Sequence, residues 1–137
     1  MGNCLVRGTI FSAYVRGIIK RLKEKETDMS HEELVDCYIK AWNELDATHL
    51  VPCLAPNFTY GSMWVFESLK GKQAYLEYIT GKFNAIRRSG SSVLAVKGIS
   101  PQTGLPRVEL SQDGKRYAKI DIQSQDGLLF EAYMHDL

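Results

Sequence analysis

Apolar residues recur every three to four positions over residues 30–46, as in an amphipathic helix that packs on a core. The core-facing positions are Leu34, Val35, Tyr38, Ala41, Trp42 and Leu45. Ser30 and Glu33 have the spacing of a capping box, which marks the start of a helix. The pattern also predicts a short helix over residues 47–54, capped by Asp46 and ended by Pro56, and a longer helix from Gly71 to about Arg88.

The remainder of the chain has the composition and alternation of strands. Residues 58–69 are rich in aromatic and β-branched side chains, and further strands are expected over 93–99, 107–112, 116–123 and 128–135. In the last three strands, a set of apolar residues falls on even positions and a set of polar ones on odd positions. The apolar set is Val108, Leu110, Ala118, Ile120, Ile122, Leu128, Phe130, Ala132 and Met134, and the polar set is Arg107, Glu109, Lys119, Asp121, Gln123, Glu131 and His135. One face of the sheet is therefore apolar, and it meets either the helices or a second subunit. Helices followed by an antiparallel sheet predict an α+β domain.

Residues 1–28 follow a different pattern. Apolar residues at helical spacing, opposite several Arg and Lys residues, predict a basic amphipathic helix that extends a domain spanning residues 29–137. Docking of this helix on the domain or on a partner is the favoured interpretation, ahead of binding to a membrane surface. Lipid modification of Met1–Cys4 is a third interpretation, although Val6 replaces the Ser or Thr of a myristoylation pattern. A natural core that begins near Met29 is a fourth.

Composition and charge narrow the class of protein. A chain of 137 residues is expected to form one domain, and its net charge of +1 favours neither nucleic acid nor a membrane as partner. Three cysteines, Cys4, Cys37 and Cys53, without a C-x-x-C spacing predict neither a disulfide framework nor a zinc site. Reduced cysteines suggest a cytoplasmic protein. His31 and His49 suggest no metal site, and we expect no cofactor.

The run from Tyr38 to Asp46, followed by Leu50, Leu54, Phe58 and Tyr60, resembles the opening of the nuclear-transport-factor-2-like superfamily. This group includes ketosteroid isomerase, the SnoaL-like polyketide cyclases and limonene epoxide hydrolase. Residues 69–76 resemble its glycine-led third helix, and residues 119–122 with 126–129 resemble its penultimate hairpin. The resemblance implies a cone-shaped α+β barrel in which a curved antiparallel sheet wraps around helices and encloses a central apolar pocket. It also implies a homodimer formed through the sheet.

The same resemblance implies candidate site residues. Tyr38 falls where ketosteroid isomerase has its oxyanion-hole tyrosine, and Asp121 falls where that enzyme has a protonated carboxylic acid. Two such donors would stabilise an enolate by about 3–4 kcal/mol each. Ser62 occupies the position of the general base, and a serine does not remove a proton beside a carbonyl unaided. His135 shares the odd face with Asp121 and is a further acid–base candidate. The candidate pocket residues are Trp42, Tyr60, Ser62, Trp64, Tyr78 and Phe83.

Each catalytic candidate also has a purely structural interpretation. Tyr38 is equally well explained as a core tyrosine with a satisfied hydroxyl group, and His135 as a solvent-exposed residue. A suitable hairpin register would place Asp121 opposite Arg107 as an ordinary cross-strand charge pair. Two functions therefore remain open. One is a cofactor-independent isomerase, cyclase or hydrolase that acts on a small apolar organic ligand by general acid–base catalysis. The other is a non-catalytic dimeric ligand-binding or interaction module.

Overall fold

The computed structural model describes residues 29–64 and 67–136. The elements in chain order are α2 (His31–Glu44), the 3-10 helix η1 (Ala47–Leu50), β2 (Leu54–Ser62), β3 (Leu69–Lys70), α3 (Lys72–Ser89), β4 (Val93–Ile99), β5 (Pro106–Gln112), β6 (Lys115–Gln125) and β7 (Leu128–His135). The predicted extension over residues 1–28, with its four interpretations, lies outside the described residues.

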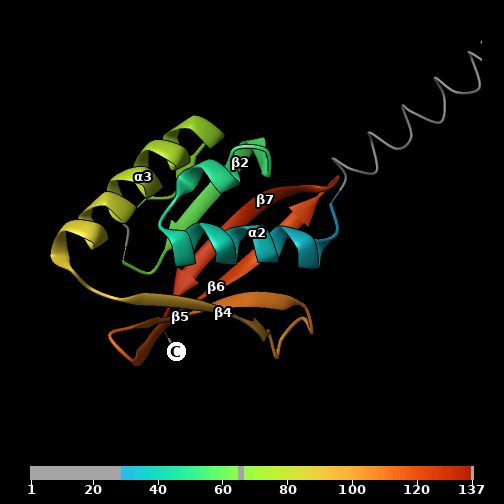
Figure 1. Ribbon diagram of the computed structural model, residues 1–137. Coiled ribbons are helices and arrows are strands. Elements are labelled where there is room, and N and C mark those ends of the chain that lie inside the picture. Colours follow the sequence, from blue (N-terminus) through green and yellow to red (C-terminus); the bar gives the residue numbers. More distant parts are fainter. Residues whose placement is uncertain (1–28, 65–66, 137) are drawn as a thin grey trace, which may run out of the picture.

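The six strands form one sheet in the order β3-β2-β7-β6-β5-β4. Figure 1 shows α2 lying across one face of this sheet, and α2 packs on β4, β5 and β6 while α3 packs on β2 and β3. Register shifts in the pairings of β2 with β7, β5 with β6 and β6 with β7 mark bulges, which bend strands and increase their twist. The predicted α+β architecture, a curved sheet packed on helices, is confirmed.

Two details of the sheet differ from the prediction. The strands β2 and β7 pair in parallel, so the sheet is mixed, although the other neighbouring pairs are antiparallel as expected. The sheet is also open, with β3 and β4 as its two edges, so that it curves without closing into a barrel. The helices cover the concave side that a closed barrel would enclose.

The start of α2 agrees with the predicted capping box. The Ser30 hydroxyl accepts a hydrogen bond from the Glu33 N–H, and the Glu33 side chain accepts one from the Ser30 N–H. Asn43, near the other end of α2, uses its side-chain amide to bond both the N–H and the carbonyl of Ala95 on β4. These contacts fix α2 along the sheet.

The short helix after α2 ends earlier than predicted. Asp46 does cap it, through a 3.0 Å hydrogen bond from the Thr48 N–H, but the helix ends at Leu50 and the strand begins at Leu54. Pro56 therefore lies inside β2. The register against β7 shifts between Leu54 and Thr59, so Pro56 lies where the ladder is interrupted and its missing N–H costs no regular pairing.

The even-position face is the one that packs on the helices. Its buried members are Val108, Leu110, Ala118, Ile120, Ile122, Ala132 and Met134. The alternation fails at the start of β7, where Leu129 is buried while Leu128 and Phe130 are only partly buried. The bulge explains this change, because Gln123 pairs with Glu131 but Ser124 pairs with Leu129, leaving Phe130 as the extra residue.

Candidate functional site

Within the described residues, two of the hollows bear on function. The first, which we call the inner cavity, has a volume of about 260 Å³ and is lined by Tyr60, Ser62, Trp64, Tyr78, Lys82, Tyr117 and Met134. The second, the rim cavity, has a volume of about 510 Å³ and lies around the loop between β4 and β5. Its lining includes His31, Arg107, Asp121 and His135.

Four of the predicted pocket residues line the inner cavity: Tyr60, Ser62, Trp64 and Tyr78. Trp42 and Phe83 instead belong to the packed core, where their rings meet edge to face with centroids 5.1 Å apart. Trp64 is 56% exposed, so it forms part of the mouth of the cavity rather than its floor. Lys82 and Tyr117 also line the cavity and were not among the predicted pocket residues. Lys82 lies one helical turn after Tyr78, and this spacing was the available signal.

Tyr38 is fully buried and its hydroxyl group hydrogen-bonds the hydroxyl group of Tyr75. The Tyr75 ring also packs on Tyr60, with centroids 5.1 Å apart, and Tyr60 packs in turn on Tyr78 at 5.4 Å. A cluster of tyrosines therefore leads from the core to the inner cavity. Burial is the main cause that raises the pKa of Tyr38, Tyr60 and Tyr75 above its usual value. These hydroxyl groups stay protonated at neutral pH. One of Tyr38 and Tyr75 donates to the other, and Tyr60 donates to the Met134 sulfur at 3.9 Å.

Ser62 lines the inner cavity at the position where the resemblance places a general base. Its Oγ accepts a hydrogen bond from the Trp64 N–H at 3.1 Å, so the hydroxyl helps to shape the turn after β2. Its own proton remains available for a further bond.

Asp121 and His135 lie together on the other face of the sheet. His135 Nε2 lies 2.6 Å from Asp121 Oδ2, and both side chains are partly exposed. Arg107 Nη1 is 4.0 Å from the second oxygen of Asp121, which has no hydrogen-bond partner among the described residues although the atom is buried.

Arg107 also bonds the Glu109 carboxylate, at 3.2 Å from Nη2. Glu109 pairs with Lys119 across the two strands. This is the cross-strand charge pattern that the sequence suggested as the structural alternative for Asp121. The structure therefore shows a connected set of charges at the rim cavity.

His31, which the sequence analysis set aside, joins α2 to the sheet beside the rim cavity. Its Nε2 lies 3.0 Å from the Pro106 carbonyl oxygen, and its Nδ1 lies 3.0 Å from Ser124 Oγ. Because a carbonyl oxygen only accepts, Nε2 carries the proton in this arrangement. His31 thus lines the rim cavity, and both of its ring nitrogens are hydrogen-bonded.

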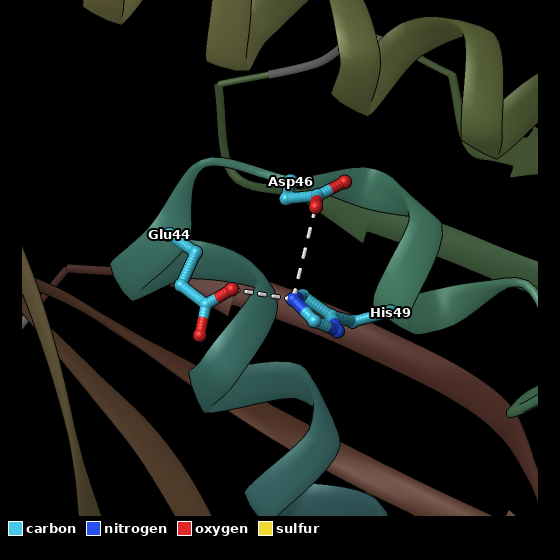
Figure 2. Close-up of side chains that lie close together, drawn as sticks. All are labelled: Glu44, Asp46 and His49. Carbon is cyan, nitrogen blue, oxygen red and sulfur yellow. Dashed lines mark hydrogen bonds and ion pairs between the residues drawn. The ribbon is translucent and has the colours of Figure 1, made fainter.

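Glu44, Asp46 and His49 form a cluster at the junction of α2 and η1 (Figure 2). His49 Nε2 lies 2.7 Å from Glu44 Oε1 and 3.8 Å from Asp46 Oδ2. These residue types can hold a metal ion, but their contacts are those of an ion pair beside a helix cap. Arg87 donates a hydrogen bond to the Glu44 carbonyl oxygen at 2.8 Å, which places a cation beside the cluster.

Among the described residues, no helix combines the length and the apolar character that crossing a membrane requires.

Comparisons with known proteins find similarity in structure. No protein-family model and no curated protein matches this chain. A nuclear-transport-factor-2-like protein of unknown function from Mesorhizobium loti superposes with a TM-score of 0.61 at 14% identity, covering 78% of this chain and 90% of that one. A proposed isomerase of the SnoaL-like family from Agrobacterium tumefaciens gives 0.55 at 16%, covering 78% and 97%.

A proposed ketosteroid isomerase from Kribbella flavida gives a TM-score of 0.56 at 14% identity and covers 78% of this chain and 77% of its own. Identities this low establish architecture and leave activity open. The chain therefore has the nuclear-transport-factor-2-like, cystatin-like fold, in agreement with the fold that the sequence resemblance implies.

Proposed function

We propose that this protein binds a compact and largely apolar small molecule in the inner cavity. The observation that carries the proposal is the lining of this cavity, in which the aromatic rings of Tyr60, Trp64, Tyr78 and Tyr117 stand beside the polar groups of Ser62 and Lys82. Ligand pockets have this composition, apolar walls with a small number of placed donors. At about 260 Å³, the cavity suits a ligand of one or two fused rings.

The polar groups define the chemistry of the ligand. The hydroxyl groups of Tyr60, Tyr78 and Ser62 can donate hydrogen bonds, and Lys82 supplies a positive charge. A ligand that ends in a carboxylate, or in another anionic oxygen, complements this set best. We therefore propose an aromatic or alicyclic acid as the ligand class.

Binding without proton abstraction follows from the same lining. Among the described lining residues there is no carboxylate and no histidine, and Ser62 stands where the isomerases keep a base. Tyr38 bonds Tyr75 inside the core, away from the Asp121–His135 pair. The inner cavity thus supplies donors, and a general base would have to come from the ligand or from solvent.

A thermal-shift series tests this proposal. The probes are 2-naphthoate and its uncharged amide, each added to the full chain. We expect the acid to raise the melting temperature more than the amide does, because only the acid pairs with Lys82. The substitution Lys82→Met should remove this preference, and Lys72→Met, on the same helix but outside the cavity lining, should keep it. Equal responses to acid and amide in the unmodified chain would contradict the proposed ligand class.

The rim cavity supports a second candidate function, general acid–base catalysis by His135. With Asp121 as a carboxylate, Nε2 of His135 donates in the 2.6 Å contact, and Nδ1 of a neutral ring is then free to accept a proton, as in an oriented catalytic histidine. Arg107 beside the pair could stabilise a developing anion.

Asp121→Asn distinguishes this function from a structural charge pair. If the pair is catalytic, Asp121→Asn should abolish turnover while the melting temperature stays nearly unchanged. Turnover is measured on esters and β-keto compounds that fit a cavity of about 510 Å³. If the unmodified chain shows no activity on these compounds and Asp121→Asn markedly lowers the melting temperature, the Asp121–His135 pair has only a structural role in the sheet.

A further inference from the structure

Cys37 on α2 and Cys53, the residue before β2, hold their sulfur atoms 3.0 Å apart. Both cysteines are free. Cys53 is fully buried, whereas Cys37 is partly exposed in the described part of the chain. The Met29 sulfur, 4.0 Å from Cys53 Sγ, completes a small group of sulfur atoms. A pair of thiols in direct contact, one of them open to solvent, has the arrangement from which disulfides form.

Backbone hydrogen bonds of Cys53 and the packing of α2 fix the positions of these two cysteines. The Cys53 N–H bonds the Leu50 carbonyl oxygen at 2.9 Å, and the Cys53 carbonyl oxygen accepts from the Leu129 N–H at 2.7 Å. Cys37 lies in the middle of α2, whose Leu34 and Tyr38 are buried in the core. A disulfide bond has an S–S length of about 2.05 Å, so the sulfur atoms need to approach by only about 1 Å. Side-chain rotation can supply this movement.

The two thiols are not equivalent. Burial raises the pKa of Cys53 to about 12, with a further contribution from Cys37, so Cys53 remains a neutral thiol at physiological pH. A solute can reach Cys37 first because Cys53 has no exposed surface. This difference gives Cys37 the role of the first sulfur to be oxidised and Cys53 the role of the resolving thiol.

We propose that Cys37 and Cys53 form an oxidation-sensitive dithiol that a peroxide converts into a disulfide bond between α2 and the start of β2. The Cys37 sulfur attacks one oxygen of hydrogen peroxide, the O–O bond breaks, and a sulfenic acid and one water molecule form. The Cys53 sulfur then attacks the Cys37 sulfur, the S–O bond breaks, and the hydroxyl group leaves as a second water with the Cys53 proton. Two thiols lose two electrons in total, and the peroxide is reduced to two water molecules.

The disulfide would join two elements that shape the core and the inner cavity. The helix α2 carries Tyr38 next to Cys37, and β2 continues from Cys53 toward Tyr60 and Ser62. Closing a loop between residues 37 and 53 restricts the unfolded chain, so the oxidised form is expected to melt at a higher temperature. Oxidation would therefore stiffen the junction of α2, η1 and β2.

The test uses the full chain with Cys4→Ser, which removes the third cysteine and keeps the pair. After brief treatment with hydrogen peroxide, the denatured protein should take up no alkylating reagent and should have lost two hydrogen atoms in mass. Proteolysis should release one peptide pair joined through Cys37 and Cys53. The melting temperature should rise by about 10 °C and return on reduction.

Two further variants are matched controls, each made in the Cys4→Ser chain. Cys53→Ser places a hydroxyl group where the thiol lies 3.5 Å from the His49 carbonyl oxygen, so that the buried group keeps an acceptor. Cys37→Ser changes the partly exposed member. Neither variant should gain thermal stability with peroxide. The proposal fails if both thiols stay reactive in the peroxide-treated Cys4→Ser chain, or if they link only between molecules.

Discussion

Tyr38 and Asp121 lie on opposite sides of the sheet. Tyr38 is on the buried face of α2 and bonds Tyr75, whereas Asp121 points away from the helices and bonds His135. The neighbours of Asp121 on β6, Ile120 and Ile122, are the ones that face the core, as strand alternation requires. The two donors that the isomerase resemblance places together are therefore in different environments, and this separation underlies both proposed functions.

The Tyr38–Tyr75 hydrogen bond should contribute to stability as a coupled pair. Either Tyr38→Phe or Tyr75→Phe leaves one buried hydroxyl group without its partner, which we expect to cost about 1–3 kcal/mol in the free energy of unfolding. The double substitution removes both groups and should cost less than the sum. Urea unfolding measures all four proteins of this cycle. Tyr133→Phe, at a residue that is 42% exposed, is the control and should change stability by less than about 0.5 kcal/mol. Additive costs would show that the two hydroxyl groups are satisfied independently.

The buried tyrosines also predict how stability depends on alkaline pH. In the folded state the pKa of Tyr38, Tyr60 and Tyr75 lies above the usual value of 10.0, so the unfolded chain ionises first. The stability is fully present below pH 10 and is lost as the pH rises further, by up to about 1.4 kcal/mol per pH unit for each tyrosine. Urea midpoints measured between pH 8 and about pH 11 should fall only in the upper part of this range. The double variant Tyr38→Phe/Tyr75→Phe should show a shallower fall, and an unchanged slope in that variant would be evidence against this origin.

Gly98 makes room for the charge network on the outer face. A Cβ atom at this position would overlap Glu109 Oε2, the oxygen that binds Arg107. Gly98→Ala should therefore displace the carboxylate and destabilise the fold by about 1–3 kcal/mol. Gly81 lies within α3, and a Cβ atom there would meet no atom within 4 Å. Gly81→Ala should accordingly stabilise the protein by about 0.5–1 kcal/mol. Thermal unfolding compares the two, and effects of the same sign would refute this explanation.

The outer face of the sheet is where we expect a second copy of the chain to bind. Val96 and Tyr133, which are 44% and 42% exposed, lie on this face beside Glu109 and Asp121. Val96→Arg should weaken a dimer about 30-fold or more, because a charge enters an apolar contact, while Glu109 opposite keeps the folded monomer stable. Val51→Arg, at a residue with the same 44% exposure outside the sheet face, should have no effect. Light scattering over a micromolar dilution series measures the mass. A monomeric mass for the unmodified chain would rule out the dimer.

The sequence by itself determined the two long helices and the last four strands, whereas the single strand expected over residues 58–69 is instead β2 and the short strand β3. The spacing of apolar residues predicted α2 and α3 to within two residues, and the strand-like composition between breaks and turns predicted β4 and β7 with the observed bounds. Local physics suffices for these features, because a helix or strand that is half buried must repeat its apolar positions with the period of its backbone. The capping residues Ser30 and Asp46 were predictable for the same reason, since their hydrogen bonds reach only two or three residues along the chain.

Only the tertiary structure decided which side chains meet. The parallel pairing of β2 with β7, and the bulge that buries Leu129 in place of Phe130, depend on strands far apart in the sequence. The same long-range register places Asp121 next to His135, on the face of the sheet opposite to Tyr38. It also brings Cys37 to Cys53 across the second half of α2 and a 3-10 helix. Contacts of this kind follow from packing the whole core, and a pattern read along one chain does not contain them.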